Sequence, residues 1–141
     1  MYLKQYLIIY CISKNMYIMD IQEHIEDDYH ISSFFPSEIQ YNLHPLIEYR
    51  IKLLLKHNVV IHSGESQKIE TVCILNKKLS KLSLMLKPYE HLPVVFESEG
   101  AINSKFNGRI KVTLTNYSIQ NVKMSAGAPV GYLILQPYSL K

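Results

Sequence analysis

Two histidines and two aspartates lie close together near the start of the chain, and side chains of these types can ligate a metal ion. They are His24, Asp27, Asp28 and His30. A stable zinc site needs three or four converging donors, each oriented by further hydrogen bonds. An acidic loop beside two histidines does not meet that requirement, and two cysteines in the whole chain are too few for a zinc knuckle or a disulfide framework. The sequence therefore predicts no metal site.

The chain also lacks the short motifs of nucleophilic and nucleotide-dependent enzymes. His57, His62 and His91 lie next to expected strand ends or turns, but no serine or cysteine nucleophile motif accompanies them. The Gly-x-Ser-x-Gly elbow, the phosphate-binding loop and the dinucleotide fingerprint do not occur in the sequence. We therefore predict no cofactor and no catalysis by a local motif.

Charge is divided unevenly along the chain, although the net charge is only +3. Residues 20–48 contain seven of the twelve acidic residues and no Lys or Arg, whereas residues 49–141 contain thirteen of the fifteen basic ones. A basic half can bind nucleic acid, or it can be a solvated surface against which an acidic segment folds. Because the lysines are scattered, we favour the second interpretation. A nucleic-acid-binding module that uses Lys105, Arg109 and Lys111 stays an alternative.

Length and composition indicate a single domain inside a cell. The 141 residues are 48% apolar and 19% charged, which permits a hydrophobic core and is not typical of disorder. No apolar run approaches the ~20 residues of a membrane-spanning helix. The short run at residues 6–12 has no signal-peptide cleavage site after it. We therefore expect no membrane contact and, with only two cysteines, a reducing compartment.

The elements that must position any functional side chain are β-strands. From residue 48 onward, apolar residues recur mostly at every second position, most clearly at Ile110, Val112 and Leu114. Turn residues separate about eight such segments, which predicts an all-β sandwich or barrel over residues 46–141. Residues 1–45 are expected to form a short N-terminal extension, partly irregular and acidic from residue 20. The expected strands are 49–55, 59–61, 68–75, 82–87, 94–96, 110–115, 122–124 and 130–135.

An ordered series of turns and strand ends in this part of the chain resembles the trimeric dUTPase superfamily. The series runs through Gly64-Glu65, Gly100-Ala101-Ile102-Asn103, Gly108-Arg109-Ile110 and Leu114-Thr115-Asn116-Tyr117-Ser118. In the family, a Gly-Glu turn, a Gly-Val-Ile-Asp hairpin, a further Gly and a strand ending in Leu-x-Asn-x-Ser follow in the same order. The resemblance spans residues 46–137 and implies a dUTPase-like β-clip or β-sandwich. It also implies structural turns at Gly64, Gly100, Gly108 and Gly127.

The resemblance implies which residues would form the family's site, and there the sequence departs from the family. The general base, which is the Asp of the hairpin, is replaced by Asn103, whose amide cannot take up a proton. The tyrosine that stacks on the deoxyribose aligns with Phe106, which can still stack. The Asp of the first motif aligns with Arg50, a reversal of charge.

The positions that would hold the phosphates are changed as well. The family's Pro-Arg-Ser aligns with Pro88, Tyr89 and Glu90, so that a carboxylate would repel a triphosphate. In the last motif, Ala128-Pro129 replaces Asp-Arg and Tyr132 replaces Gln. The glycine-rich C-terminal arm of the family has no counterpart in the sequence. Turn formers are kept and chemical groups are replaced, so we expect the fold without its catalytic residues.

The resemblance thus implies a degenerate viral dUTPase-related protein, most like the baculovirus telokin-like protein. We expect a non-enzymatic accessory or interaction protein in the cytoplasm or nucleus of an infected host cell. Its expected partner is a protein that the sequence does not identify, and a homotrimer is the assembly that the family suggests. The enzymatic alternative is a divergent nucleotide hydrolase, such as a dUTP-type pyrophosphatase, or a deaminase, that uses Glu90, Glu97, Glu99 or His91 in place of the lost Asp.

Overall fold

The computed structural model describes residues 6–13, 16–22, 28–30, 47–75, 82–103 and 106–137. Within these ranges, no helix is long and apolar enough to cross a membrane. The prediction of an all-β fold is confirmed. In chain order the strands are β1 (Tyr6–Ser13), β2 (Met16–Gln22), β3 (Tyr29–His30), β4 (Ile47–Leu54), β5 (Val59–Ile61), β6 (Ser66–Leu75), β7 (Leu82–Pro88), β8 (Val95–Phe96), β9 (Gly100–Ala101), β10 (Gly108–Thr115), β11 (Val122–Met124) and β12 (Pro129–Pro137).

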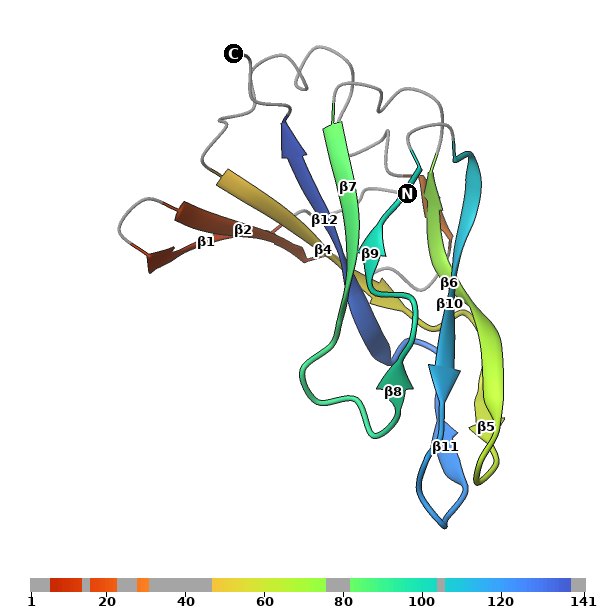
Figure 1. Ribbon diagram of the computed structural model, residues 1–141. Coiled ribbons are helices and arrows are strands. Elements are labelled where there is room, and N and C mark those ends of the chain that lie inside the picture. Colours follow the sequence, from red (N-terminus) through yellow and green to blue (C-terminus); the bar gives the residue numbers. More distant parts are fainter. Residues whose placement is uncertain are drawn as a thin grey trace.

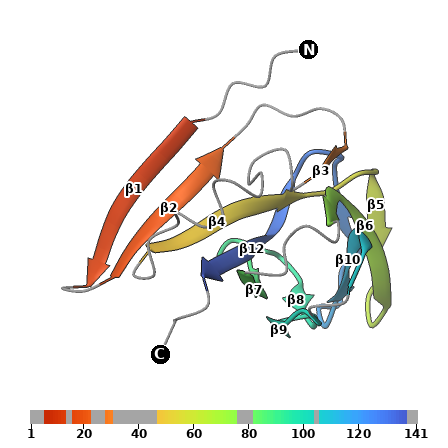
Figure 2. The ribbon, with the colours of Figure 1, turned by 90° about the horizontal axis from the view of Figure 1, so that it is seen from above.

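The strands form two main sheets and a short ribbon. The larger sheet has the order β1-β2-β4-β12-β7-β9 and the smaller one β3-β6-β10-β8, while β5 and β11 pair with each other. Figure 1 shows the larger sheet facing β6 and β10, with the β5–β11 ribbon at one end of the molecule. The β1–β2 hairpin continues the larger sheet beyond β4 and projects from the body (Figure 2).

The hydrophobic core lies between the two main sheets and is built from alternating positions. On β10, Val112 and Leu114 are fully buried, whereas Lys111 is exposed. The same alternation on β4 and β12 directs Leu53 and Leu133 into the core. Because successive strand side chains point to opposite faces, one face of each sheet is left for surface side chains. Those surface positions on β6 and β10 form the site described below.

The eight strands expected from residue 46 onward correspond to β4 to β8 and β10 to β12. The additional strand, β9, has only two residues and therefore too little sequence to show an alternation. In the N-terminal segment, β2 runs parallel to β4, from the pair Tyr17–Ile47 to the pair Ile21–Ile51. This pairing joins the N-terminal segment to the sheet of the β domain. The division of the chain into an extension (residues 1–45) and a β domain (residues 46–141) stays a prediction.

The turn at Gly64 is tied to the end of β10. Gly64 has a φ of 77°, a left-handed conformation that glycine adopts without a steric penalty. Its N–H donates to the carbonyl oxygen of Asn116 over 2.7 Å, and the N–H of Asn116 donates to the carbonyl oxygen of Glu65 over 2.9 Å. Two parts of the motif series that lie far apart in sequence thus meet in space. The backbone is also in a positive-φ conformation at Gly100, Gly108 and Gly127.

Candidate functional site

Asn103 and Phe106 lie in the connection between β9 and β10, and both line a cavity of about 770 Å³. The N–H of Phe106 donates to the carbonyl oxygen of Asn103 over 2.9 Å. The resemblance implied a hairpin at this point. The flanking strands instead belong to different sheets, because β9 pairs with β7 whereas β10 pairs with β6 and β8. We call this space the β9–β10 cavity; its apolar wall consists of Leu86, Ile102, Phe106 and Ile110.

Charged side chains of β6 and β10 form another wall of the same cavity. They are Lys68 and Glu70 from β6, and Arg109 and Lys111 from β10. The Nε atom of Arg109 lies 3.4 Å from Oε2 of Glu70, so these two charges offset each other. Glu70 is the one carboxylate among the described residues that line the cavity. A proton acceptor in this space would have to be Glu70, and its carboxylate is held by Arg109.

Asp28, just before β3, forms an ion pair with Arg109 at this wall. The two Nη atoms of Arg109 donate to the two carboxylate oxygens of Asp28 over 2.7 and 2.6 Å. Lys56 adds a contact of 2.8 Å to the same carboxylate. The hydrogen bond from Arg109, supported by Lys56 and opposed by partial burial, holds the pKa of Asp28 far below its usual range. Arg109 also donates to the carbonyl oxygen of Thr71 over 2.9 Å.

The expectation of no metal site concerned four residues, of which the structure describes two. His24 and Asp27 lie outside the described residues, as does the side chain of His30. Asp28 contacts two cationic side chains. No three His, Cys, Asp or Glu side chains within the described ranges are grouped so that they could hold a metal ion.

A second group of predicted positions meets on the other face of the β4–β12–β7 part of the larger sheet. The hydroxyl of Tyr132 donates to the carboxylate of Glu90, with both oxygens 2.9 Å away. The guanidinium carbon of Arg50 lies 4.6 Å from the centroid of the Tyr132 ring, a cation–π geometry. The Tyr89 ring lies 6.0 Å from that ring, centroid to centroid. We call Arg50, Tyr89, Glu90 and Tyr132 the tyrosine cluster; Pro88 precedes it and pairs with Gly131.

Burial and hydrogen bonding fix the protonation states of Tyr132 and Glu90 in the tyrosine cluster. Tyr132 is only 5% exposed, and burial together with the hydrogen bond to Glu90 raises its pKa well above the usual value. Desolvation opposes ionisation of Glu90, but its own backbone N–H, the Tyr132 hydroxyl and nearby positive charge hold its pKa below the usual value. At neutral pH, Tyr132 is therefore a hydrogen-bond donor and Glu90 an ionised acceptor.

Comparison with solved structures identifies the fold. The dUTPase of Staphylococcus aureus phage phi11 superposes with a TM-score of 0.52 at 13% identity, over 64% of this chain and 77% of that chain. A mutant dUTPase of Staphylococcus bacteriophage 80alpha with dUpNHpp superposes with a TM-score of 0.54 at 12% identity, over 96% of this chain and 85% of that chain. The chain has a dUTPase-like fold. No protein-family model matches the sequence, and no curated protein matches it by sequence.

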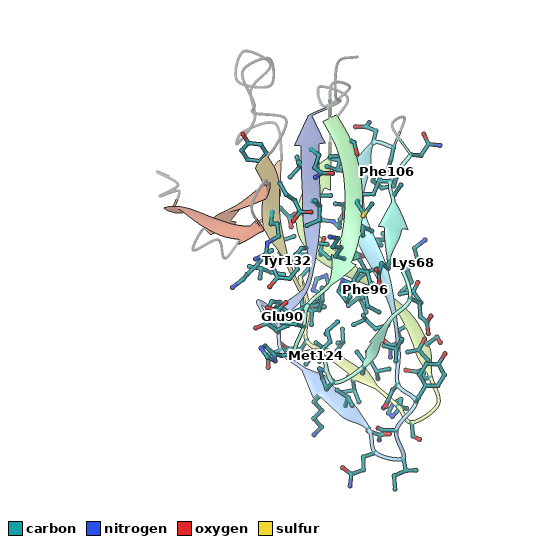
Figure 3. The ribbon with its side chains drawn as sticks, turned by 60° about the vertical axis from the view of Figure 1, so that its left-hand side comes forward. Lys68, Glu90, Phe96, Phe106, Met124 and Tyr132 are labelled. Carbon is teal, nitrogen blue, oxygen red and sulfur yellow. The ribbon has the colours of Figure 1, made fainter. Side chains whose placement is uncertain are left out.

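The dUTPase-like fold places the predicted site positions in two groups. Figure 3 shows Phe106 and Lys68 on one side of the molecule and Glu90 with Tyr132 on the other. The structure thus brings Arg50, Tyr89, Glu90 and Tyr132 together and separates them from the cavity. The likeness to the baculovirus telokin-like protein stays a prediction.

Sequence reasoning did not identify Lys68, Glu70 and Asp28 as neighbours of the cavity. The sequence signal that could have indicated Lys68 and Glu70 is the alternation of apolar and polar residues along β6, which places both side chains on the surface face of the strand. Their approach to Arg109 and Lys111 depends on the β6–β10 register, in which Lys111 pairs with Glu70. A single sequence does not encode that register in any local pattern.

Proposed function

We propose that this chain is a non-enzymatic viral accessory protein that acts by binding, built on a dUTPase-like fold whose catalytic groups are lost. The observation that carries the proposal is the wall of the β9–β10 cavity. Asn103 lines it where the resemblance requires a general base, and the cavity's one described carboxylate, Glu70, is paired with Arg109. Loss of a general base slows a reaction by about 10²–10⁴-fold.

The tyrosine cluster supports the same proposal at the positions that would hold phosphates. An ionised carboxylate, Glu90, is kept there by the Tyr132 hydroxyl. The guanidinium of Arg50 lies over the Tyr132 ring. A triphosphate at this place would meet a fixed negative charge, and the loss of donors aimed at developing charge removes a large part of catalysis.

The test is dUTP turnover by the purified full chain with magnesium, measured as pyrophosphate release. We expect a rate equal to that of the solution without protein. The Glu70→Gln variant is the matched control, because it removes the one described carboxylate of the cavity and little volume. Turnover by the unaltered chain that Glu70→Gln abolishes would overturn the proposal in favour of a divergent pyrophosphatase.

The assembly and the location belong to the same proposal. Solved dUTPases of phages share the fold, which supports a viral origin and a role inside an infected cell. We propose the trimer that the dUTPase resemblance implies. Light scattering of the protein as it elutes from a size-exclusion column would then give three times the mass of the chain.

The proposed partner is a protein. Nucleic acid is disfavoured because Arg109, a cation of the basic half, is held by Asp28 and Glu70.

A further inference from the structure

Two lysines of the β9–β10 cavity take part neither in the ion pairs of Arg109 nor in the tyrosine cluster. Lys68 and Lys111 are exposed, and both line the cavity. The β6–β10 register pairs Lys68 with Thr113 and Lys111 with Glu70, so the two lysines lie on the same face of adjacent strands. Among the described residues, no carboxylate lies within ion-pair distance of either ammonium group. This wall therefore has two positive charges available to a ligand.

Within the chain itself, Arg109 of this surface already binds the carboxylate of Asp28, which lies directly before β3. Asp28 precedes β3, whose two residues run parallel to β6 at Cys73 and Ile74. Its carboxylate binds Arg109 through two parallel hydrogen bonds. The pair is strong because both partners are charged and the geometry is bidentate. An acidic residue directly before a short strand is thus already bound beside the cavity.

The cavity also offers an apolar contact. Phe106 is a large hydrophobic side chain that is 41% exposed, and Leu86 and Ile102 line the same space. A volume of about 770 Å³ is enough for a few side chains and far too small for a folded domain. A ligand that fits this chemistry has one or two negative charges next to an apolar side chain.

We propose that the β9–β10 cavity is the docking site for an acidic, extended segment of a partner protein. One carboxylate of that segment lies between Lys68 and Lys111, and an adjacent apolar side chain packs on Phe106. The inference rests on the proposed function, in which the protein acts by binding. A nucleic-acid strand fits less well, because it carries a charge on every phosphate, whereas Lys68 and Lys111 offer two cations and Arg109 is already paired.

The test uses the full chain and a labelled peptide, acetyl-Gly-Glu-Phe-Glu-Gly-amide, with binding followed by fluorescence anisotropy. A twin peptide with glutamine in place of both glutamates has the same shape and no charge. The variants are Lys68→Gln, Lys111→Gln and Phe106→Ala. The matched controls are Lys123→Gln, an exposed lysine of β11, and Ile119→Ala, a side chain that is 94% exposed. All five positions are exposed, so none of the changes removes core packing.

We expect each cavity variant to weaken binding of the acidic peptide about fivefold or more, and the two controls to change it less than twofold. The glutamine twin should bind more weakly than the acidic peptide. Lys111→Gln should not weaken binding of the twin further, because the interaction between lysine and peptide needs a charge on both partners. Equal binding of the two peptides would overturn the docking site. So would equal losses for Lys111→Gln and Lys123→Gln, or displacement of the peptide by a single-stranded oligonucleotide.

Failure of this inference is distinguishable from failure of the proposed function. If the peptide does not bind and dUTP is not turned over, the docking site is refuted and the loss of catalysis stands. If dUTP is turned over, the proposed function is refuted whatever the peptide does. If dUMP displaces the peptide from the unaltered chain and dUTP is not turned over, the cavity is a nucleotide-binding site. The docking site is then refuted.

Discussion

Asn116 is fully buried, and its side chain bonds with two segments of the chain, the end of β5 and the loop that follows β10. Its amide nitrogen donates to the carbonyl oxygens of Ile61 and Gln120 over 2.9 and 2.7 Å. Its amide oxygen accepts from the N–H and the hydroxyl of Ser118 over 3.0 and 2.7 Å. The Leu-x-Asn-x-Ser pattern is thus explained by structure, because the asparagine closes the loop that follows β10 and ties it to β5.

We predict that Asn116→Ala lowers the free energy of unfolding by about 3 kcal/mol, because the buried carbonyl oxygen of Ile61 loses this donor and the N–H and hydroxyl of Ser118 lose their acceptor. Urea unfolding of the full chain measures this. Ser118→Ala is the control, since it removes one hydroxyl from an exposed residue and should cost about 1 kcal/mol. If Asn116→Ala cost no more than Ser118→Ala, the buried hydrogen bonds would not be what stabilises this loop.

The ion pair of Asp28 makes stability depend on pH in a known direction. The pKa of Asp28 is lowered in the folded chain, first by the hydrogen bond from Arg109. Its contribution is therefore complete above the ordinary carboxyl pKa of the unfolded chain, about 3.9, and is lost as the pH falls toward the folded value. Because the side chain of Asp28 is 34% exposed, solvent screens the pair.

We predict that Asp28→Asn lowers the free energy of unfolding by about 1 kcal/mol near neutral pH. The difference from the unaltered chain should shrink at about pH 3, where the unfolded chain already binds the proton. Urea unfolding at both pH values measures it. Glu99→Gln, at an exposed carboxylate, is the control and should show no such trend. A difference that grew in acid would have the wrong sign for this ion pair.

At the scale of the elements, β12 can approach β7 closely because residue 131 is glycine. A Cβ atom at Gly131 would lie 2.7 Å from the carbonyl oxygen of Lys87 and 3.0 Å from Cε2 of Phe96. Gly131 pairs with Pro88 of β7 on one side and with Leu53 of β4 on the other, so a shift of β12 away from β7 would press it against β4. This glycine therefore sets the spacing on which the neighbouring tyrosine cluster depends.

We predict that Gly131→Ala lowers the free energy of unfolding by about 1–3 kcal/mol, the usual cost of overpacking. Thermal or urea unfolding measures it. Adding Phe96→Leu should recover only part of the loss, because the contact with the backbone carbonyl remains. A fully stable Gly131→Ala variant, or complete recovery in the double variant, would contradict this account of the spacing.

From residue 46 onward, sequence reasoning was sufficient for every strand except β9, and it was insufficient for the contacts between strands. Alternation at Ile110, Val112 and Leu114 is a local signal, so β10 could be predicted. Asn103 and Phe106 are close in sequence, so their shared place in the cavity followed from the motif. The contact of Asp28 with Arg109, 81 residues apart, has no local signal and depends on how β3 lies beside β6.

At the scale of the whole molecule, the two groups of predicted site positions lie on different sides of one chain (Figure 3). A single chain therefore cannot bring Asn103 and Glu90 to the same small ligand. In the proposed trimer, a site could be completed only across a subunit boundary. Restoring one group of side chains would leave the other group unchanged.

Because the two groups are separate, a substitution in the cavity leaves the tyrosine cluster unchanged. Asn103→Asp restores a carboxylate in the β9–β10 cavity but leaves Glu90 and Tyr132 at the positions that would hold phosphates. We expect dUTP turnover by this variant to stay at the rate without protein, although a general base is worth about 10²–10⁴-fold in a complete site. Asn107→Asp, another residue of the cavity wall, is the matched control. Turnover by Asn103→Asp and not by Asn107→Asp would show that only the base is missing, and that phosphate binding had survived the changes in the tyrosine cluster.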